Sequence, residues 1–139
     1  MEPKQTQEVN LPDSAARRLL TGLGRAARKR CPYCGGGAIF QSWFTLKDRC
    51  PSCGTLYAYE DGYFLGAYAI NLIVTEFATV ALVIWLIAGT DLEVLPMQLI
   101  GISLAVALPL FFYPIALLIW IALDNTFHPP GTSSGRQRS

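Results

Sequence analysis

Basic residues are absent from the central part of this chain, and histidine is almost absent from all of it. None of the eleven lysines and arginines lies between residues 60 and 131, and the one histidine is His128. Of the 139 residues, 52% are hydrophobic, and this content is concentrated after residue 62. An ordinary soluble domain carries charges of both signs over its whole surface, so the distribution argues against one and indicates a membrane protein.

Paired catalytic groups are missing as well. The sequence shows no nucleophile beside a base, and Glu76 has no second acidic residue near it in the apolar part of the chain. Catalysis by an intramembrane site normally needs such a pair, so we predict that the protein is not an enzyme. The lone His128, next to Pro129, is expected to be an ordinary surface residue.

All four cysteines lie in one short stretch with the spacing C-x2-C-x15-C-x2-C, namely Cys31, Cys34, Cys50 and Cys53. Both pairs read C-P-x-C-G, in which proline fixes one backbone torsion and the glycine tolerates positive φ. Two tight turns of this kind can place four thiolates tetrahedrally around one metal ion, so the pattern predicts a structural Zn²⁺ site. A four-thiolate iron site of the rubredoxin type is the alternative, and two disulfides would suit an oxidising compartment.

The residues around the cysteines predict a small β zinc ribbon over residues 25–60. Residues 38–46 are rich in aromatic and β-favouring side chains and are expected to form one strand, with residues 55–59 returning beside it. Such a small unit buries too little apolar surface to fold alone, so the metal must contribute folding energy. The candidate core residues are Phe40, Trp43, Phe44, Leu56 and Tyr57.

Residues 1–24 are predicted to form a disordered basic arm, and residues 125–139 a disordered tail. Asp13 or Ser14 is suited to cap a short helix that follows it. The arm is open to three interpretations, which are contact with anionic lipid headgroups, a solvated linker, and a nucleic-acid-binding arm.

Residues 61–124 predict two transmembrane helices, at about 63–88 and 97–123, joined by a short acidic connection. Pro109 and Pro114 are expected to kink the second span and to free backbone carbonyls near them. The connection carries no lysine or arginine while both flanks do, which predicts that the termini and the ribbon are cytoplasmic. The predicted fold class is therefore a membrane protein with a four-cysteine zinc ribbon followed by a two-helix transmembrane hairpin in the inner (plasma) membrane.

A polar stripe marks the middle of the first span, formed by Asn71, Thr75, Glu76 and Thr79. Polar stripes inside membranes usually face protein or water. The stripe is consistent with a proton or ion relay, with docking of a polar group on a partner, and with hydrogen bonding between helices of an oligomer. Beside the lipid bilayer, we therefore expect a membrane-protein partner or a second copy. Nucleic acid is not expected, because the ribbon is held close to the membrane surface.

Several segments together resemble a known family. The similar segments are RCPYCGGGAIF, WF and RCPSCG, followed by a DG pair, two apolar spans and YPIALLIWIALDNTFHPP. With these segments the chain resembles the domain-of-unknown-function 983 family of small bacterial membrane proteins. The resemblance implies a zinc-ribbon-like cytoplasmic head on a two-span anchor and no established activity. Some members are encoded near terminal-oxidase components, which implies an accessory role in assembling a membrane complex.

Overall fold

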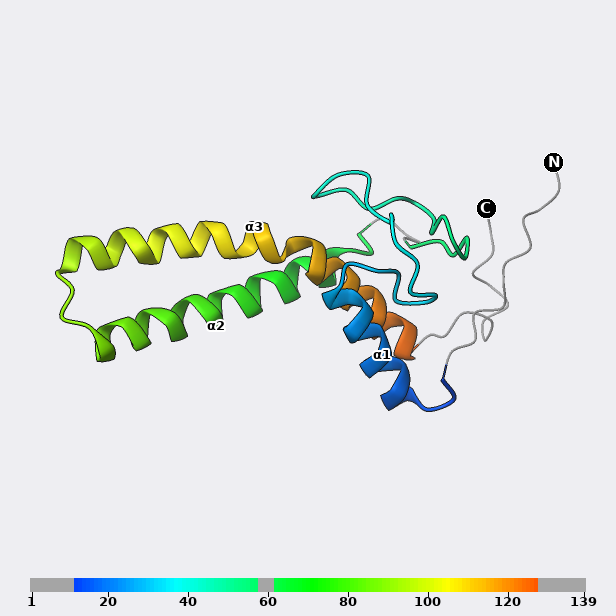
Figure 1. The fold of residues 1–139 in the computed structure, drawn as a ribbon, viewed down its shortest axis with the longest axis horizontal. Helices are drawn as coiled ribbons and strands as arrows, with labels where there is room; N and C mark the ends of the chain where they lie inside the picture. Colours follow the sequence, from blue (N-terminus) through cyan, green and yellow to red (C-terminus); the bar gives the residue numbers. More distant parts are fainter. Residues whose placement is uncertain (1–11, 58–61, 128–139) are drawn as a thin grey trace.

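The computed structural model describes residues 12–57 and 62–127, and its described part contains three helices. These are α1 (Ala15–Ala27), α2 (Leu65–Gly89) and α3 (Val94–Phe127). Figure 1 shows α2 and α3 as a long antiparallel hairpin, with α1 and the cysteine-rich loops at the end away from the α2–α3 connection. All four cysteines therefore lie at one end of an elongated molecule.

Both hairpin helices are long and apolar enough to cross a membrane. At about 1.5 Å per residue, α2 is about 37 Å long, which exceeds a hydrocarbon core of about 30 Å. Its buried residues are Ala67, Asn71, Thr75 and Thr79, while most of its large apolar side chains are exposed. A helix with so much exposed apolar surface is suited to lipid, in agreement with the hairpin that the sequence predicted.

Pro114 divides α3 into two parts with different surroundings. Every buried residue of α3 lies at or after Pro114, in the part of the helix that packs against α1 and the cysteine-rich loops. The preceding residues 94–113 rise about 30 Å, which matches the hydrocarbon core by themselves. The apolar run of α3 is thus an exposed part followed by a protein-covered part, and the helix continues to Phe127.

Helix α1 begins where the sequence predicted a cap, since the Arg17 amide donates to Ser14 Oγ over 3.3 Å. It packs against the end of α3 and buries Gly22 and Ala26. Residues 15–24 are therefore part of a packed helix, where the sequence predicted a disordered arm. Residues 1–11 and 128–139, which hold the rest of the predicted arm and most of the tail, lie outside the described residues.

Gly22 sets the close approach of α1 to α3, which leads to a prediction with a matched control. A Cβ at Gly22 would lie 2.9 Å from the Cβ of Ala122, whereas a Cβ at Gly24 would meet nothing within 4 Å. Gly22→Ala should therefore destabilise the protein by about 1–3 kcal/mol through overpacking. Gly24→Ala should stabilise it slightly, because alanine favours a helix. Thermal unfolding in detergent measures both, and equal midpoints would show that the helices are not in close contact.

The predicted β ribbon is wrong. The described residues contain no β-strand, only two isolated antiparallel bridges, Phe40↔Leu46 and Arg49↔Leu56. The segment between the knuckles reverses direction after only a few backbone hydrogen bonds between its two arms. Ala38, with a φ of 57°, interrupts the extended conformation at the start of the first arm. A ladder this short cannot propagate, so the cysteine-rich region, residues 28–57, is a set of loops rather than a sheet.

The core of the cysteine-rich region is completed by another part of the chain. Of the predicted core residues, Tyr57 is buried, Phe40 and Leu56 are half-buried, and Trp43 and Phe44 are exposed. The buried cluster contains three of the cysteines, Tyr33, Ile39 and Tyr57 together with Ala26 of α1 and Leu118 and Ile121 of α3, and Cys34 packs against it. The end of α3 therefore supplies apolar surface that the small loop region lacks.

Candidate metal centre

The two cysteine pairs adopt the same turn. In the first knuckle, residues 31–36, the Gly35 amide donates to the Cys31 carbonyl over 2.8 Å. In the second knuckle, residues 50–55, the Gly54 amide donates to the Cys50 carbonyl over the same 2.8 Å. Both glycines are left-handed, with φ of 77° and 73°, a conformation that glycine adopts at no steric cost. The repeated C-P-x-C-G sequence thus makes a repeated backbone.

The four sulfurs converge on one point between the knuckles. All four Sγ atoms lie within 4.8 Å of one another, with Cys31 to Cys53 at 4.0 Å and Cys34 to Cys50 at 3.7 Å. A tetrahedral ion with metal–sulfur bonds of about 2.3 Å requires sulfurs about 3.8 Å apart. All four thiols are free, and their separations are far from a disulfide bond of about 2.05 Å. The arrangement therefore fits a single metal ion with four thiolate ligands.

The ionisation of the thiols also points to a cation. Hydrogen bonding to Cys31 lowers the pKa of Cys53 to about 4, and the Thr55 hydroxyl, 3.2 Å from its sulfur, acts in the same direction. The same contact raises the pKa of Cys31, and burial raises the pKa of Cys34. The Cys53 thiolate is thus stabilised at the expense of Cys31, and a cation bound between the knuckles would favour the thiolate forms of its ligands.

Tyr57 places a hydroxyl beside this cluster. The residue is 1% exposed, and within the described residues its hydroxyl makes no hydrogen bond of ordinary geometry, although the Cys31 and Cys50 sulfurs lie beside it. Burial and the neighbouring Cys31 and Cys50 thiols raise the pKa of Tyr57, so the group stays a donor. A buried hydroxyl without a partner costs free energy, and thiolates on a metal would accept its hydrogen bond. Tyr57 is therefore placed to donate to the sulfurs of Cys31 and Cys50, which would be stronger acceptors as metal-bound thiolates.

An arginine contacts the backbone of each knuckle. Arg25 of α1 donates from Nη1 to the carbonyls of Pro32 and Tyr33, over 3.1 and 2.7 Å. Arg49 donates to the carbonyl of Gly54 over 3.4 Å. Four thiolates around a divalent ion would carry a net negative charge, which these guanidinium groups would partly offset. Sequence reasoning missed Arg25, because only the packing of α1 brings it to the knuckle.

Gly36 allows the knuckles to meet, which gives a second matched prediction. A Cβ on Gly36 would lie 2.8 Å from Ser52 Cβ and 3.2 Å from Cys34 Sγ, whereas one on Gly37 would meet nothing within 4 Å. Gly36→Ala should push the knuckles apart and lower metal affinity about 10- to 100-fold, as other changes around the ligands do. Gly37→Ala should bind normally. Competition with a chromophoric chelator measures both, and equal affinities would contradict this account.

The structure separates the predicted polar stripe. Asn71, Thr75 and Thr79 are buried toward α3, and the Asn71 side chain donates to the Pro109 carbonyl over 3.2 Å. The two threonine hydroxyls donate to carbonyls of their own helix. Glu76 is exposed on another face of α2, so it is not part of the α2–α3 contact. The relay and docking interpretations of Glu76 stay predictions.

Trp43 ties the cysteine-rich region to the hairpin. Pro114 has no backbone N–H, so the Leu110 carbonyl loses its normal helical donor. Trp43 Nε1 donates to this carbonyl over 2.9 Å. The loop between the knuckles thus contacts α3 near the end of its exposed apolar part.

Comparison with protein families agrees with this architecture. The family described as "Protein of unknown function (DUF983)" matches residues 40–124, well over half of the chain. The chain belongs to the DUF983 family. The DUF983 match covers the second knuckle, α2 and most of α3, and it begins after the first knuckle. No curated protein and no solved structure matches the chain.

Proposed function

We propose that this protein is a non-catalytic, membrane-anchored zinc module that docks a protein partner, as an accessory in assembling a membrane complex. The observation that carries the proposal is the convergence of four Sγ atoms within 4.8 Å, in two matched knuckles fixed to the end of an apolar hairpin. Zinc is the expected ion because four-cysteine knuckle sites commonly hold it structurally. Such a site fixes a surface rather than performing chemistry.

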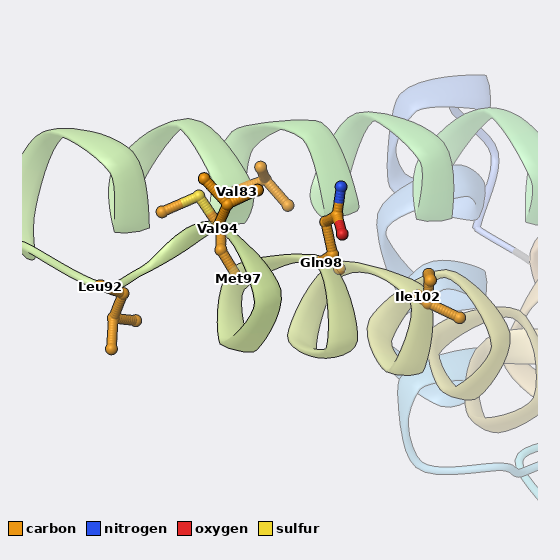
Figure 2. A pocket seen from close by; sticks show the side chains of 7 residues that line it. Val83, Leu92, Val94, Met97, Gln98 and Ile102 are labelled. Carbon is orange, nitrogen blue, oxygen red and sulfur yellow. The ribbon is translucent and has the colours of Figure 1, made fainter.

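Two features support a role without catalysis. Four protein thiolates fill a tetrahedral ion, whereas a catalytic zinc keeps one position open for water or substrate. An open hollow of about 580 Å³ lies instead at the α2–α3 connection, where Gln98 is the one polar side chain among seven lining residues (Figure 2). Since the cysteines lie at the other end of the hairpin, the hollow does not form a site with them (Figure 1).

The distribution of charge supports a cytoplasmic location for the metal centre. All lysines and arginines lie outside residues 60–131, and nine of the eleven precede residue 50. The α2–α3 connection carries Asp91 and Glu93 but no cation. The positive-inside rule then puts both termini and the metal centre in the cytoplasm, with the connection on the opposite side. A partner would reach the zinc module at the inner face of the membrane.

Metal analysis of the purified full-length protein tests the proposal. We expect one zinc per chain and no visible absorbance after purification in detergent under reducing conditions. A red, redox-active product containing iron would overturn the zinc assignment in favour of electron transfer. Protein that stays metal-free after incubation with zinc would overturn the metal module itself. Crosslinking in native membranes should then join the cysteine-rich region to a membrane protein, and crosslinks confined to α2 and α3 would contradict docking at the zinc module.

A further inference from the structure

Five aromatic rings from three parts of the chain form one exposed group, here called the aromatic patch. It consists of Trp43 and Phe44 from the loop between the knuckles, Tyr68 of α2, and Phe111 and Tyr113 of α3. Trp43 meets Phe111 edge-on at 6.2 Å between ring centroids, Phe44 lies 5.6 Å from Tyr113, and Tyr113 lies 5.7 Å from Tyr68. Trp43, Phe44, Tyr68 and Phe111 are 44%, 52%, 53% and 67% exposed, so the patch faces outward.

Helix lengths place the aromatic patch at the edge of the hydrocarbon core. Counted from the α2–α3 connection, residues 70–89 of α2 and 94–113 of α3 each rise about 30 Å, the thickness of that core. Both 30 Å segments end at the same depth along the hairpin, because the hydroxyls of Tyr68 and Tyr113, near these ends, are 3.2 Å apart. Trp43 joins this level through its hydrogen bond to Leu110. The loop tip therefore lies level with the membrane boundary.

The chemistry of the aromatic patch suits lipid. Tryptophan and tyrosine concentrate at membrane–water boundaries because one edge of each ring is apolar and the other polar. The Lys29 ammonium lies 3.5 Å from the centroid of the Trp43 ring, which places a cation where lipid phosphates lie. The patch also continues into the exposed apolar surface of α3 at Leu110 and Phe111. It is thus an extension of the surface that already faces the bilayer.

We propose that the loop of residues 41–45 inserts its aromatic side chains into the headgroup boundary of the bilayer, so that lipid holds the metal centre at a fixed height and orientation. The proposal rests on the membrane-spanning hairpin and on the docking of the loop to α3, and it is independent of the identity of the metal. It gives Trp43 two roles, since the nitrogen binds α3 while the exposed part of the ring contacts lipid. The cysteine-rich region is thereby attached to the membrane by its own surface as well as by α3.

Depth-dependent fluorescence quenching tests this contact. The Trp85→Phe/Trp120→Phe protein keeps Trp43 as its one tryptophan and is reconstituted in phosphatidylcholine vesicles with lipids brominated either near the headgroup or near the chain end. We expect the shallow bromines to quench Trp43 at least about twofold more than the deep ones, as for a residue of an interfacial belt. Because Trp120 packs over Gly66, a second comparison keeps it. Trp85→Phe is compared with Trp43→Phe/Trp85→Phe, and the difference isolates Trp43.

The other outcomes overturn either this inference or the proposed zinc module. Quenching by aqueous iodide but not by brominated lipid would show that the loop stands in water. Protection from both quenchers would show that protein, either a second copy or a partner, covers the aromatic patch. Zinc content is measured on the same samples. Bound zinc without lipid quenching would reject this inference alone, whereas lipid quenching without bound metal would reject the proposed zinc module alone.

Discussion

Replacing Cys50 with serine is expected to abolish metal binding and to release the cysteine-rich region from α3. Cys50 is 2% exposed and belongs to the buried cluster that includes Cys31, Leu118 and Ile121. In small zinc domains, metal binding contributes an apparent free energy of about 10–16 kcal/mol to folding. A loop region without a sheet has no other interactions of that size. We expect metal content to fall below about one tenth of the wild-type value.

Hydrogen exchange measures the second part of this expectation. In Cys50→Ser, amides of residues 31–57 should exchange rapidly, because the cluster that joins them to α3 is lost. Amides of α2 should stay protected, since its contact with α3 does not involve the cysteines. Ser52→Ala changes an exposed residue of the same knuckle and serves as the control. A Cys50→Ser protein that keeps its metal, or keeps its protection without metal, would contradict the account.

The hydrogen bond from Trp43 to Leu110 gives the second large effect. Trp43→Phe keeps an aromatic ring next to Phe111 but removes the N–H that serves the Leu110 carbonyl. Leaving a carbonyl without a donor near the hydrocarbon costs about 1–3 kcal/mol, and we expect a loss of that size in the free energy of unfolding. Chemical unfolding in detergent measures it. Trp85→Phe, which alters an exposed tryptophan of α2, should have little effect.

A double-mutant cycle with Pro114 tests the mechanism. Pro114→Ala restores a backbone N–H at the position that normally donates to Leu110, so the carbonyl no longer depends on Trp43. In that background Trp43→Phe should cost much less than in the wild type, and the difference is the coupling energy. Additive effects of the two substitutions would show that the proline and the tryptophan act independently.

The parts of the molecule that could be predicted from the sequence are those determined by local patterns. The convergence of Cys31, Cys34, Cys50 and Cys53 follows from two tight turns, and each turn is specified within five consecutive residues. The two apolar helices follow from long apolar runs, each long enough to cross a membrane. In both cases the residues that decide the structure are neighbours in sequence.

Contacts between distant segments explain what was missed. Hydropathy depends on the composition of α3 and not on the residues that pack against it. The change from exposed to buried residues at Pro114 could therefore not be predicted from the sequence. Trp43 and Phe44 have strand-favouring side chains, yet their environment is set by α3, far along the chain. Thr75 and Glu76 are adjacent in sequence, yet Thr75 is buried and Glu76 is exposed. Adjacent residues of a helix are about 100° apart, so a polar stripe as wide as this one does not show which of its members face the neighbouring helix.

The completion of the cysteine-rich core by Leu118 and Ile121 has a consequence for biosynthesis. A ribosome makes both knuckles before either span, and it makes the end of α3 after the rest of the hairpin. The nascent chain therefore carries its four thiols into the membrane-insertion stage without the apolar surface that later covers them. Metal capture would order the knuckles during that interval, before the apolar surface of α3 is available. We accordingly expect loading to precede insertion of the hairpin, and final docking to wait until the last turns of α3 have left the ribosome.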